Sequence, residues 1–214
     1  MQFDAILFDK DGTIFDSEHS NKSAWLASTK AFGIEYNDAD YQRFVGLPTQ
    51  ACFDMAKREF PADFPWSAFL DDLRERLRTN FANGVPFKKG FEAFFAHAKT
   101  LNIPLGLVTS AQRTGTELSF QHSGYLNDFS VIVTVDDVSE AKPSPEAYLL
   151  ACSKLQVDPA KTLVFEDSSV GVQAAVAAKC VTVAIPDFTA IDPALVAQCH
   201  ASLANFEQAY RLFK

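Results

Sequence analysis

Residues 5–13 read AILFDKDGT, a short apolar run that ends abruptly in two aspartates and a glycine. The wholly apolar AILF is typical of a strand buried on both faces of a parallel sheet. Asp9 and Asp11 follow at once, and Gly12 allows the chain to turn sharply away. Loops after parallel strands build active sites, so these carboxylates suit a nucleophile or a metal ligand. A polar strand end with an Asp-Gly turn is the structural alternative.

Apolar runs of the same kind recur at residues 105–109, 131–135, 162–165 and 181–185. Between them, apolar residues recur every three or four positions at 90–101, as in a helix, and segments 145–155 and 170–178 are also expected to be helical. This alternation predicts an α/β fold, a doubly wound, Rossmann-like parallel sheet with helices on both faces.

The segment 15–85 interrupts that alternation, because it contains no convincing strand. Helices are expected at 17–32, 49–60 and 66–81, the first beginning at Ser17 and ending at Gly33. We therefore predict two domains. Residues 1–14 and 86–214 form the α/β core, and residues 15–85 form an inserted helical cap.

A second acid pair, Glu166 and Asp167, follows the apolar run 162–165. Two acid pairs at the ends of neighbouring strands repel each other in a half-buried site, and a divalent cation relieves that repulsion. Carboxylate oxygens suit Mg²⁺. As an alternative, Ser168 simply caps the next helix and Asp167 interacts with its dipole.

Two weaker candidates are the hydroxyl pair Thr109–Ser110 and the lysine that precedes Pro143, Lys142. Hydroxyls are common in turns, and a lone lysine is usually a surface residue. Placed among acids and a phosphate group, however, the ammonium group of Lys142 balances the charge of both.

Taken together, these residues resemble the haloacid dehalogenase (HAD) superfamily of phosphotransferases over essentially the whole chain. The resemblance rests on DKDGT at 9–13, KPSPE at 142–146 and FEDS at 165–168, in this order. Asp16-Ser17-Glu18 and the run 167–178 are similar to the beta-phosphoglucomutase-like branch, which carries a helical cap.

This resemblance implies a role for each residue. Asp9 is the expected nucleophile, which forms an aspartyl-phosphate, and Asp11 is the general acid and then the base for water. Thr109 and the backbone of Ser110 are expected to bind the phosphoryl group. Lys142 is expected to steady both that group and the Asp9 carboxylate.

The same resemblance implies a Mg²⁺ cofactor. Its expected ligands are the carboxylates of Asp9 and Asp167 and the backbone carbonyl of Asp11, with Glu166 close to the metal and included in the ligand set.

Two cap positions bear on the reaction. Mutases of this branch carry a histidine near Asn21 and an arginine near Thr49 that grips a second phosphate, and this sequence has neither there. The resemblance therefore favours a phosphatase over a mutase, and Asp11 argues against a dehalogenase. Residues 46–48 lie where relatives place a substrate-specificity loop.

We accordingly expect a Mg²⁺-dependent phosphatase that hydrolyses small phosphorylated metabolites, sugar phosphates above all. The open alternatives are a beta-phosphoglucomutase-like sugar-phosphate mutase and a non-catalytic, phosphate-binding regulatory protein. The intact set of Asp9, Asp11, Lys142 and Asp167 speaks against the regulatory protein, which has no need of all four.

Composition limits the partners. The 214 residues include 19 Lys and Arg and 27 Asp and Glu, so the net charge of −8 argues against nucleic acid or an anionic membrane as a partner.

Four scattered cysteines and the absence of a signal or spanning segment suggest a reduced, cytoplasmic protein. We expect a monomer and leave an oligomer open. The 20 phenylalanines predict two ring-filled cores.

Overall fold

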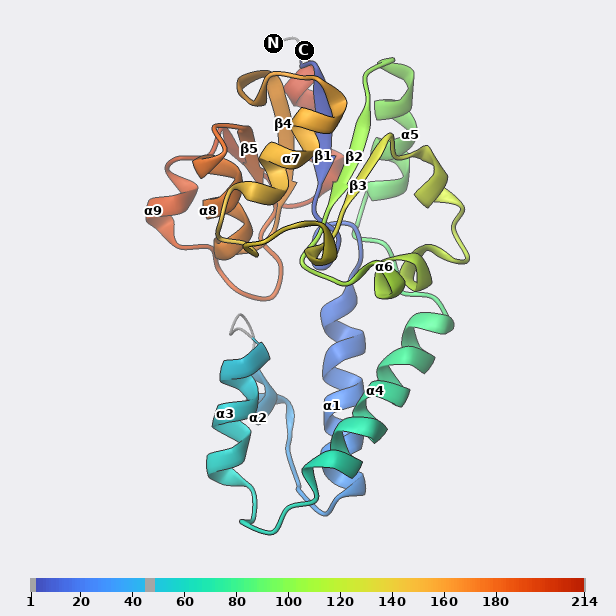
Figure 1. Cartoon of the computed structure of the whole chain (residues 1–214), viewed down its shortest axis with the longest axis vertical. Helices are drawn as coiled ribbons and strands as arrows, with labels where there is room; N and C mark the ends of the chain where they lie inside the picture. The colour runs from blue at the N-terminus through green and yellow to red at the C-terminus, as the bar shows by residue number, and fades with distance from the viewer. Residues whose placement is uncertain (1–2, 45–48, 214) are drawn as a thin grey trace. The chain divides into compact units, whose positions relative to one another are not determined.

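The computed structural model describes residues 3–44 and 49–213, with the side chains of residues 49–51 left out. The specificity-loop hypothesis for residues 46–48 therefore lies outside the described residues. The chain divides into two compact units, one of Met1–Asp16 with Pro86–Lys214 and one of Ser17–Val85 (Figure 1).

A six-stranded parallel sheet forms the centre of the first unit, which confirms the predicted doubly wound α/β fold. Its order is β3-β2-β1-β4-β5-β6. The strands are β1 (Ala5–Phe8), β2 (Leu105–Val108), β3 (Val131–Val133), β4 (Thr162–Glu166), β5 (Val181–Ala184) and β6 (Ala201–Ser202). Because β1 lies between β2 and β4, the residues that follow these three strands come together at one edge of the sheet.

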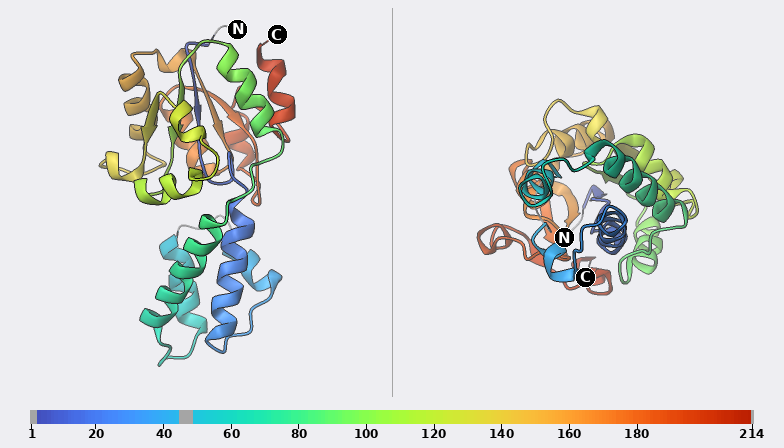
Figure 2. Two further views of the ribbon diagram at one scale, coloured as in Figure 1. Left: turned by 90° about the vertical axis from the view of Figure 1, so that its right-hand side faces the viewer. Right: turned by 90° about the horizontal axis from the view of Figure 1, so that it is seen from below.

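Helices cover both faces of this sheet. They are α5 (Phe91–Thr100), α6 (Arg113–Phe120), α7 (Glu146–Leu155), α8 (Ser169–Ala177) and α9 (Pro193–Val196), with 3₁₀ turns η1 (Tyr125–Asp128), η2 (Val135–Asp137), η3 (Pro159–Lys161) and η4 (Phe206–Phe213). On one face, α7 and α8 pack on Leu7 and Val164. On the other, α5 and η4 lie side by side (Figure 2).

Phenylalanine rings fill the core beneath α5 and η4. Phe8 stacks on Phe165 with ring centroids 5.4 Å apart, and Phe94 meets Phe165 edge-on at 5.3 Å. All three side chains are fully buried. Aromatic pairs of this kind add about 1 kcal/mol each beyond the area they bury. Phe8 directly precedes Asp9, and Phe165 directly precedes Glu166. This packing therefore also fixes the backbone positions of the two acids.

The second unit is wholly helical in its described part. Its helices are α1 (Ser17–Ala31), α2 (Asp38–Gln42), α3 (Thr49–Glu59) and α4 (Trp66–Ala82). Trp25 packs edge-on against Phe69 at 5.5 Å in its aromatic core. The sequence analysis missed α2, a single turn held by a capping box between Asn37 and Asp40. No helix in the described ranges combines the length and apolarity needed to cross a bilayer.

The turn between α8 and β5 is left-handed at Lys179, with φ at 63°. The amide of Lys179 donates to Val176 O and that of Cys180 to Ala175 O, as at a helix C-terminus closed by a residue in this conformation. Glycine adopts it without strain, whereas a residue with a Cβ atom does not.

We therefore expect Lys179→Gly to raise the free energy of unfolding by about 1 kcal/mol, because it removes that strain. Urea denaturation provides the measurement. Lys154→Gly, inside α7 with ordinary helical geometry, is the matched control and should lower stability by about 1 kcal/mol. Equal losses in both variants would contradict the interpretation.

Candidate active site

The predicted site residues of the first unit converge at the carboxyl edge of the sheet. Asp9 follows β1, and its amide donates to Phe165 O at 3.0 Å. Thr109 follows β2, and its amide donates to Val133 O at 2.9 Å. Glu166 ends β4. Thr109 is buried and its hydroxyl accepts from Ala111 N, while Ser110 beside it is exposed.

Lys142 joins three strand ends through one buried ammonium group. Its Nζ donates to Asp9 Oδ1 at 2.7 Å, to Glu166 Oε1 at 2.8 Å and to Val108 O at 3.1 Å. Only 4% of its side chain is exposed, so the surface-lysine alternative is wrong. An ammonium group has three hydrogens, and these three acceptors suffice for all of them.

Glu166 is fully buried, and both of its oxygens accept hydrogen bonds. Oε1 accepts from the hydroxyl of Tyr148 at 2.6 Å as well as from Lys142. Oε2 accepts from the Asp167 amide at 3.2 Å and from Ser168 Oγ at 3.3 Å. A Cβ atom on Gly171 would lie 1.9 Å from Oε1. Protein donors therefore bind both oxygens of this carboxylate, and the backbone at Gly171 packs closely against it.

Tyr148 is a site residue that the sequence analysis missed. It is fully buried on α7, and Lys142 Nζ lies 4.9 Å from the centre of its ring. The only signal in the sequence is a tyrosine on the apolar face of the helix that follows Lys142. Such a position is indistinguishable from ordinary core until the hydroxyl is seen to donate to Glu166.

Asp167 is held beside the first aspartate loop. Its Oδ1 accepts from Thr13 Oγ1 at 3.0 Å. Gly12 has φ at 80°, and a Cβ atom there would lie 2.1 Å from Asp167 Oδ2. The glycine is thus needed both for its backbone conformation and for this close approach. Ser168 also caps α8, since its Oγ accepts from Gly171 N at 3.1 Å.

Asp11 is paired with its neighbour in the chain. Lys10 Nζ lies 3.0 Å from Asp11 Oδ2 and also donates to Ser119 Oγ at 3.2 Å. The Lys10 side chain is buried, and the sequence analysis gave it no role. Asp11 Oδ1 is buried without a hydrogen-bond partner among residues 3–44 and 49–213.

The electrostatics show that this site lacks positive charge. Burial raises the pKa of Asp9 to about 7, although Lys142 opposes the shift. Burial, with Asp9 and Glu166 nearby, raises the pKa of Asp167 well above its usual range. Burial alone would lower the pKa of Lys142, but Asp9 and Glu166 more than offset it and the pKa rises. One ammonium group does not balance three carboxylates.

The arrangement fits a hard divalent cation. Asp9, Glu166 and Asp167 each offer a carboxylate oxygen, and these oxygens lie within 4.8 Å of one another. Carboxylates at such spacing suit Mg²⁺, and a cation would lower the raised pKa values of Asp9 and Asp167. Among the described residues, the Asp9 carboxylate accepts one side-chain hydrogen bond, from Lys142, and the Asp167 carboxylate accepts one, from Thr13. These two carboxylates therefore suit a metal better than that of Glu166, whose oxygens accept several.

The raised pKa of Asp9 makes the stability of the metal-free protein depend on pH. Asp9 binds a proton up to about pH 7 when folded but only up to about 3.8 when unfolded. The contribution of protonated Asp9 to the free energy of unfolding is complete below about pH 4 and is lost as the pH rises through about 7. In EDTA, wild type should therefore lose stability to urea between pH 5 and pH 8, and Asp9→Asn should lose less. An equal loss in both proteins would contradict the assignment.

The close approach of Gly12 to Asp167 gives a second prediction. Gly12→Ala should reduce kcat/KM by about a hundredfold, because the added methyl group displaces the Asp167 carboxylate or the loop. Gly115→Ala in α6 is the matched control, since a Cβ atom there meets nothing within 4 Å. Equal activity of the two variants in a steady-state assay would refute this prediction.

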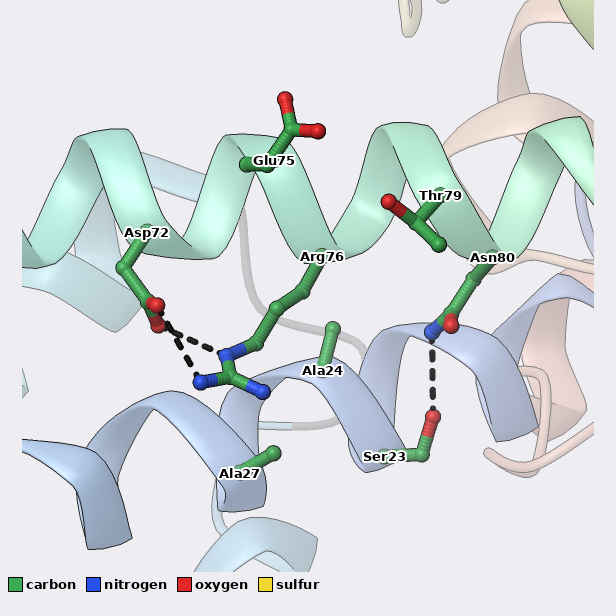
Figure 3. A pocket seen from close by; sticks show the side chains of 8 residues that line it. All are labelled: Ser23, Ala24, Ala27, Asp72, Glu75, Arg76, Thr79 and Asn80. Atoms are coloured by element: carbon green, nitrogen blue, oxygen red, sulfur yellow. Dashed lines mark hydrogen bonds and ion pairs between the residues drawn. The ribbon is translucent and has the colours of Figure 1, made fainter.

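The helical unit has a pocket of its own, about 530 Å³, between α1 and α4 (Figure 3). Arg76 pairs with Asp72 at 2.7 Å, and Asn80 Nδ2 donates to Ser23 Oγ at 3.2 Å. Four of its polar side chains are thus paired within the pocket, and it contains none of the predicted catalytic residues. We assign it no chemistry.

Comparison with known proteins agrees with this geometry. The sequence profile of the haloacid dehalogenase-like hydrolases matches residues 6–185. The chain is 32% identical over 186 residues to validoxylamine A 7'-phosphate phosphatase of Streptomyces hygroscopicus subsp. limoneus, covering 79% of each protein. It is 27% identical over 180 residues to the fructose-1-phosphate phosphatase YqaB of Escherichia coli (strain K12), covering 83% of this chain and 93% of that protein.

The fold is also found in solved structures. A Thermotoga maritima protein described as a candidate beta-phosphoglucomutase superposes with a TM-score of 0.86 at 25% identity, over 100% of this chain and 98% of that one. Phosphatases and a mutase candidate thus share this architecture, so the architecture alone does not choose the reaction.

Proposed function

The chain belongs to the haloacid dehalogenase-like hydrolases, and we propose that it is a phosphatase that hydrolyses small sugar phosphates through a phosphorylated aspartate, with Mg²⁺. One observation carries the proposal. Asp9 Oδ1 accepts from Lys142 Nζ at 2.7 Å, the one hydrogen bond to this carboxylate among the described residues, and 11% of the Asp9 side chain is exposed. A carboxylate fixed by one oxygen, with the other available, is arranged as a nucleophile.

In the first step, Asp9 Oδ2 attacks phosphorus, and the bond from phosphorus to the leaving oxygen breaks. Asp11 gives its proton to that oxygen. Thr109 Oγ and the amide of Ser110 bind phosphoryl oxygens, and Lys142 offsets their charge next to the Asp9 carboxylate. Phosphoryl transfer depends mainly on such positioning and charge balance.

In the second step, water attacks the phosphorus of phosphorylated Asp9, and Asp11 takes the proton from that water. The bond from phosphorus to Asp9 breaks, which releases inorganic phosphate and restores the carboxylate. The carboxylates of Asp9 and Asp167 and the carbonyl of Asp11 would hold Mg²⁺, which would supply the positive charge that the site lacks. Glu166 instead orients Lys142, since both of its oxygens already accept protein donors.

The sugar-phosphate class rests on the relatives. One is named for the phosphate ester of validoxylamine A and another for fructose 1-phosphate. We propose further that the unit Ser17–Val85 serves as the cap. The whole chain shares its fold with a candidate mutase, so a sugar-phosphate mutase is the second candidate function. Asn21 and Thr49 stand where mutases carry a histidine and an arginine, and this favours hydrolysis.

Asp9→Asn should abolish phosphate release from a panel of sugar phosphates, because the amide is not a nucleophile. Phosphate release is measured with Mg²⁺ and with EDTA, and EDTA should abolish the activity of the wild type. Asp63→Asn, at an exposed position of the helical unit, is the control and should leave the rate unchanged.

Turnover by Asp9→Asn would refute the nucleophile. Isomerisation of a glucose 1-phosphate anomer by wild type, with no phosphate released, would identify a mutase instead.

A further inference from the structure

Two cysteines far apart in the sequence meet at the amino end of the sheet, away from the catalytic edge. Cys152 lies on α7, and Cys180 lies in the turn before β5. Leu163 of β4 pairs with Val181 of β5, so one residue earlier in the same register Cys180 lies beside Thr162. Neighbours in a parallel pair lie about 4.8 Å apart and point to the same face.

The side chains on that face place Cys152 and Cys180 in one cluster beside Thr162. Cys152 Sγ donates to Thr162 Oγ1 at 3.7 Å, which places it over the neighbour of Cys180. Cys180 packs against the apolar cluster that contains Cys152. Both cysteines thus lie beside Thr162, Cys152 through its thiol and Cys180 through the strand register.

The other two cysteines have different surroundings. Cys52 Sγ donates to Phe44 O at 3.4 Å, and Cys199 Sγ donates to Leu195 O at 3.5 Å, so both thiol groups donate to backbone carbonyl oxygens. All four are free thiols in this structure. Cys152 and Cys180 are the two that share one cluster and lie beside Thr162.

The neighbouring thiol of Cys180 lowers the pKa of Cys152 to about 7, against the effects of burial and of Asp158. The Cys152 thiol, together with burial, raises the pKa of Cys180. The pair therefore loses its first proton near neutral pH and its second only in strong base. A thiolate is the reactive form of cysteine. Cys152 is buried, whereas Cys180 is partly exposed, so a small oxidant reaches the pair from the side of Cys180.

We propose that Cys152 and Cys180 are a redox-active thiol pair, a modification site that a hydroperoxide converts to an intrachain disulfide. The thiolate sulfur attacks one peroxide oxygen, the O–O bond breaks, and the departing oxygen leaves as water or an alcohol. The partner thiol then attacks the sulfenic sulfur, the S–S bond forms, the S–O bond breaks, and water departs with the remaining proton. Two thiols lose two electrons in all, the peroxide gains them, and a dithiol reductant reverses the change.

This inference does not depend on the phosphatase proposal, since the pair lies at the other end of the strands. It concerns the segment that supports the site, however. Helix α7 carries Cys152 near its end and Tyr148 one turn earlier, where the hydroxyl holds Glu166. A disulfide would join that helix covalently to the turn between α8 and β5.

The test is peptide mapping of the full chain after hydrogen peroxide treatment and thiol alkylation. Trypsin leaves Cys180 and Cys199 in one peptide, because no lysine or arginine lies between them. The Cys199→Ser protein therefore makes the assignment unambiguous. We expect the Cys152 and Cys180 peptides to appear linked, lighter than their sum by two hydrogen atoms and separated again by dithiothreitol.

Matched variants complete the test. Cys180→Ser and Cys152→Ser should each lose the linked peptide and keep one alkylatable thiol of the pair, and circular dichroism should show both folded. Wild type should lose two thiols per chain. The proposal is overturned if Cys199→Ser yields no linked peptide, if a single cysteine ends as sulfinic acid, or if the link joins two chains.

Discussion

One buried ammonium group holds the catalytic edge of this protein together. Lys142 Nζ bonds to groups at the ends of β1, β2 and β4, the three adjacent strands on which the site is built. Removing a charge from water costs several kcal/mol unless it is fully paired, and here all three hydrogens have acceptors. The same bonds fix one oxygen of Asp9 and one of Glu166. Geometry and charge balance therefore depend on a single side chain.

The packing behind the edge makes this arrangement rigid. Phe8 and Phe165, stacked at 5.4 Å, precede Asp9 and Glu166 directly, so the rings and the acids cannot shift independently. At the catalytic edge, the backbone at Gly12 lies against the Asp167 carboxylate and the backbone at Gly171 lies against the Glu166 carboxylate. Both approaches are too close for a residue with a side chain. Burial, reinforced by the crowded carboxylates, raises the pKa of Asp9 and of Asp167. The rigid packing thus holds more negative than positive charge at this edge. That imbalance suits a bound cation and, once the cation is present, a phosphate group.

Much of the fold was predictable, because buried parallel strands read as continuous apolar runs and their helices as periodic ones. The single-turn α2 was not, since five residues give too little periodicity and its capping box is local. Tyr148 and Lys10 were missed for another reason. Each is an ordinary residue for its element, and only its hydrogen-bond partner, Glu166 for one and Ser119 for the other, distinguishes it.

The order and chemistry of the groups at the strand ends could be read from the chain alone, because apolar patterning locates each strand end and the next residue is then known. The distances between those groups could not. Lys142 is 133 positions from Asp9 yet lies 2.7 Å from it, and Cys152 shares a cluster with Cys180 although β4 and α8 separate them in the chain. Such contacts depend on strand order, on register and on how α7 packs against the sheet. These are properties of the whole core, because each side chain's position is fixed by many neighbours at once.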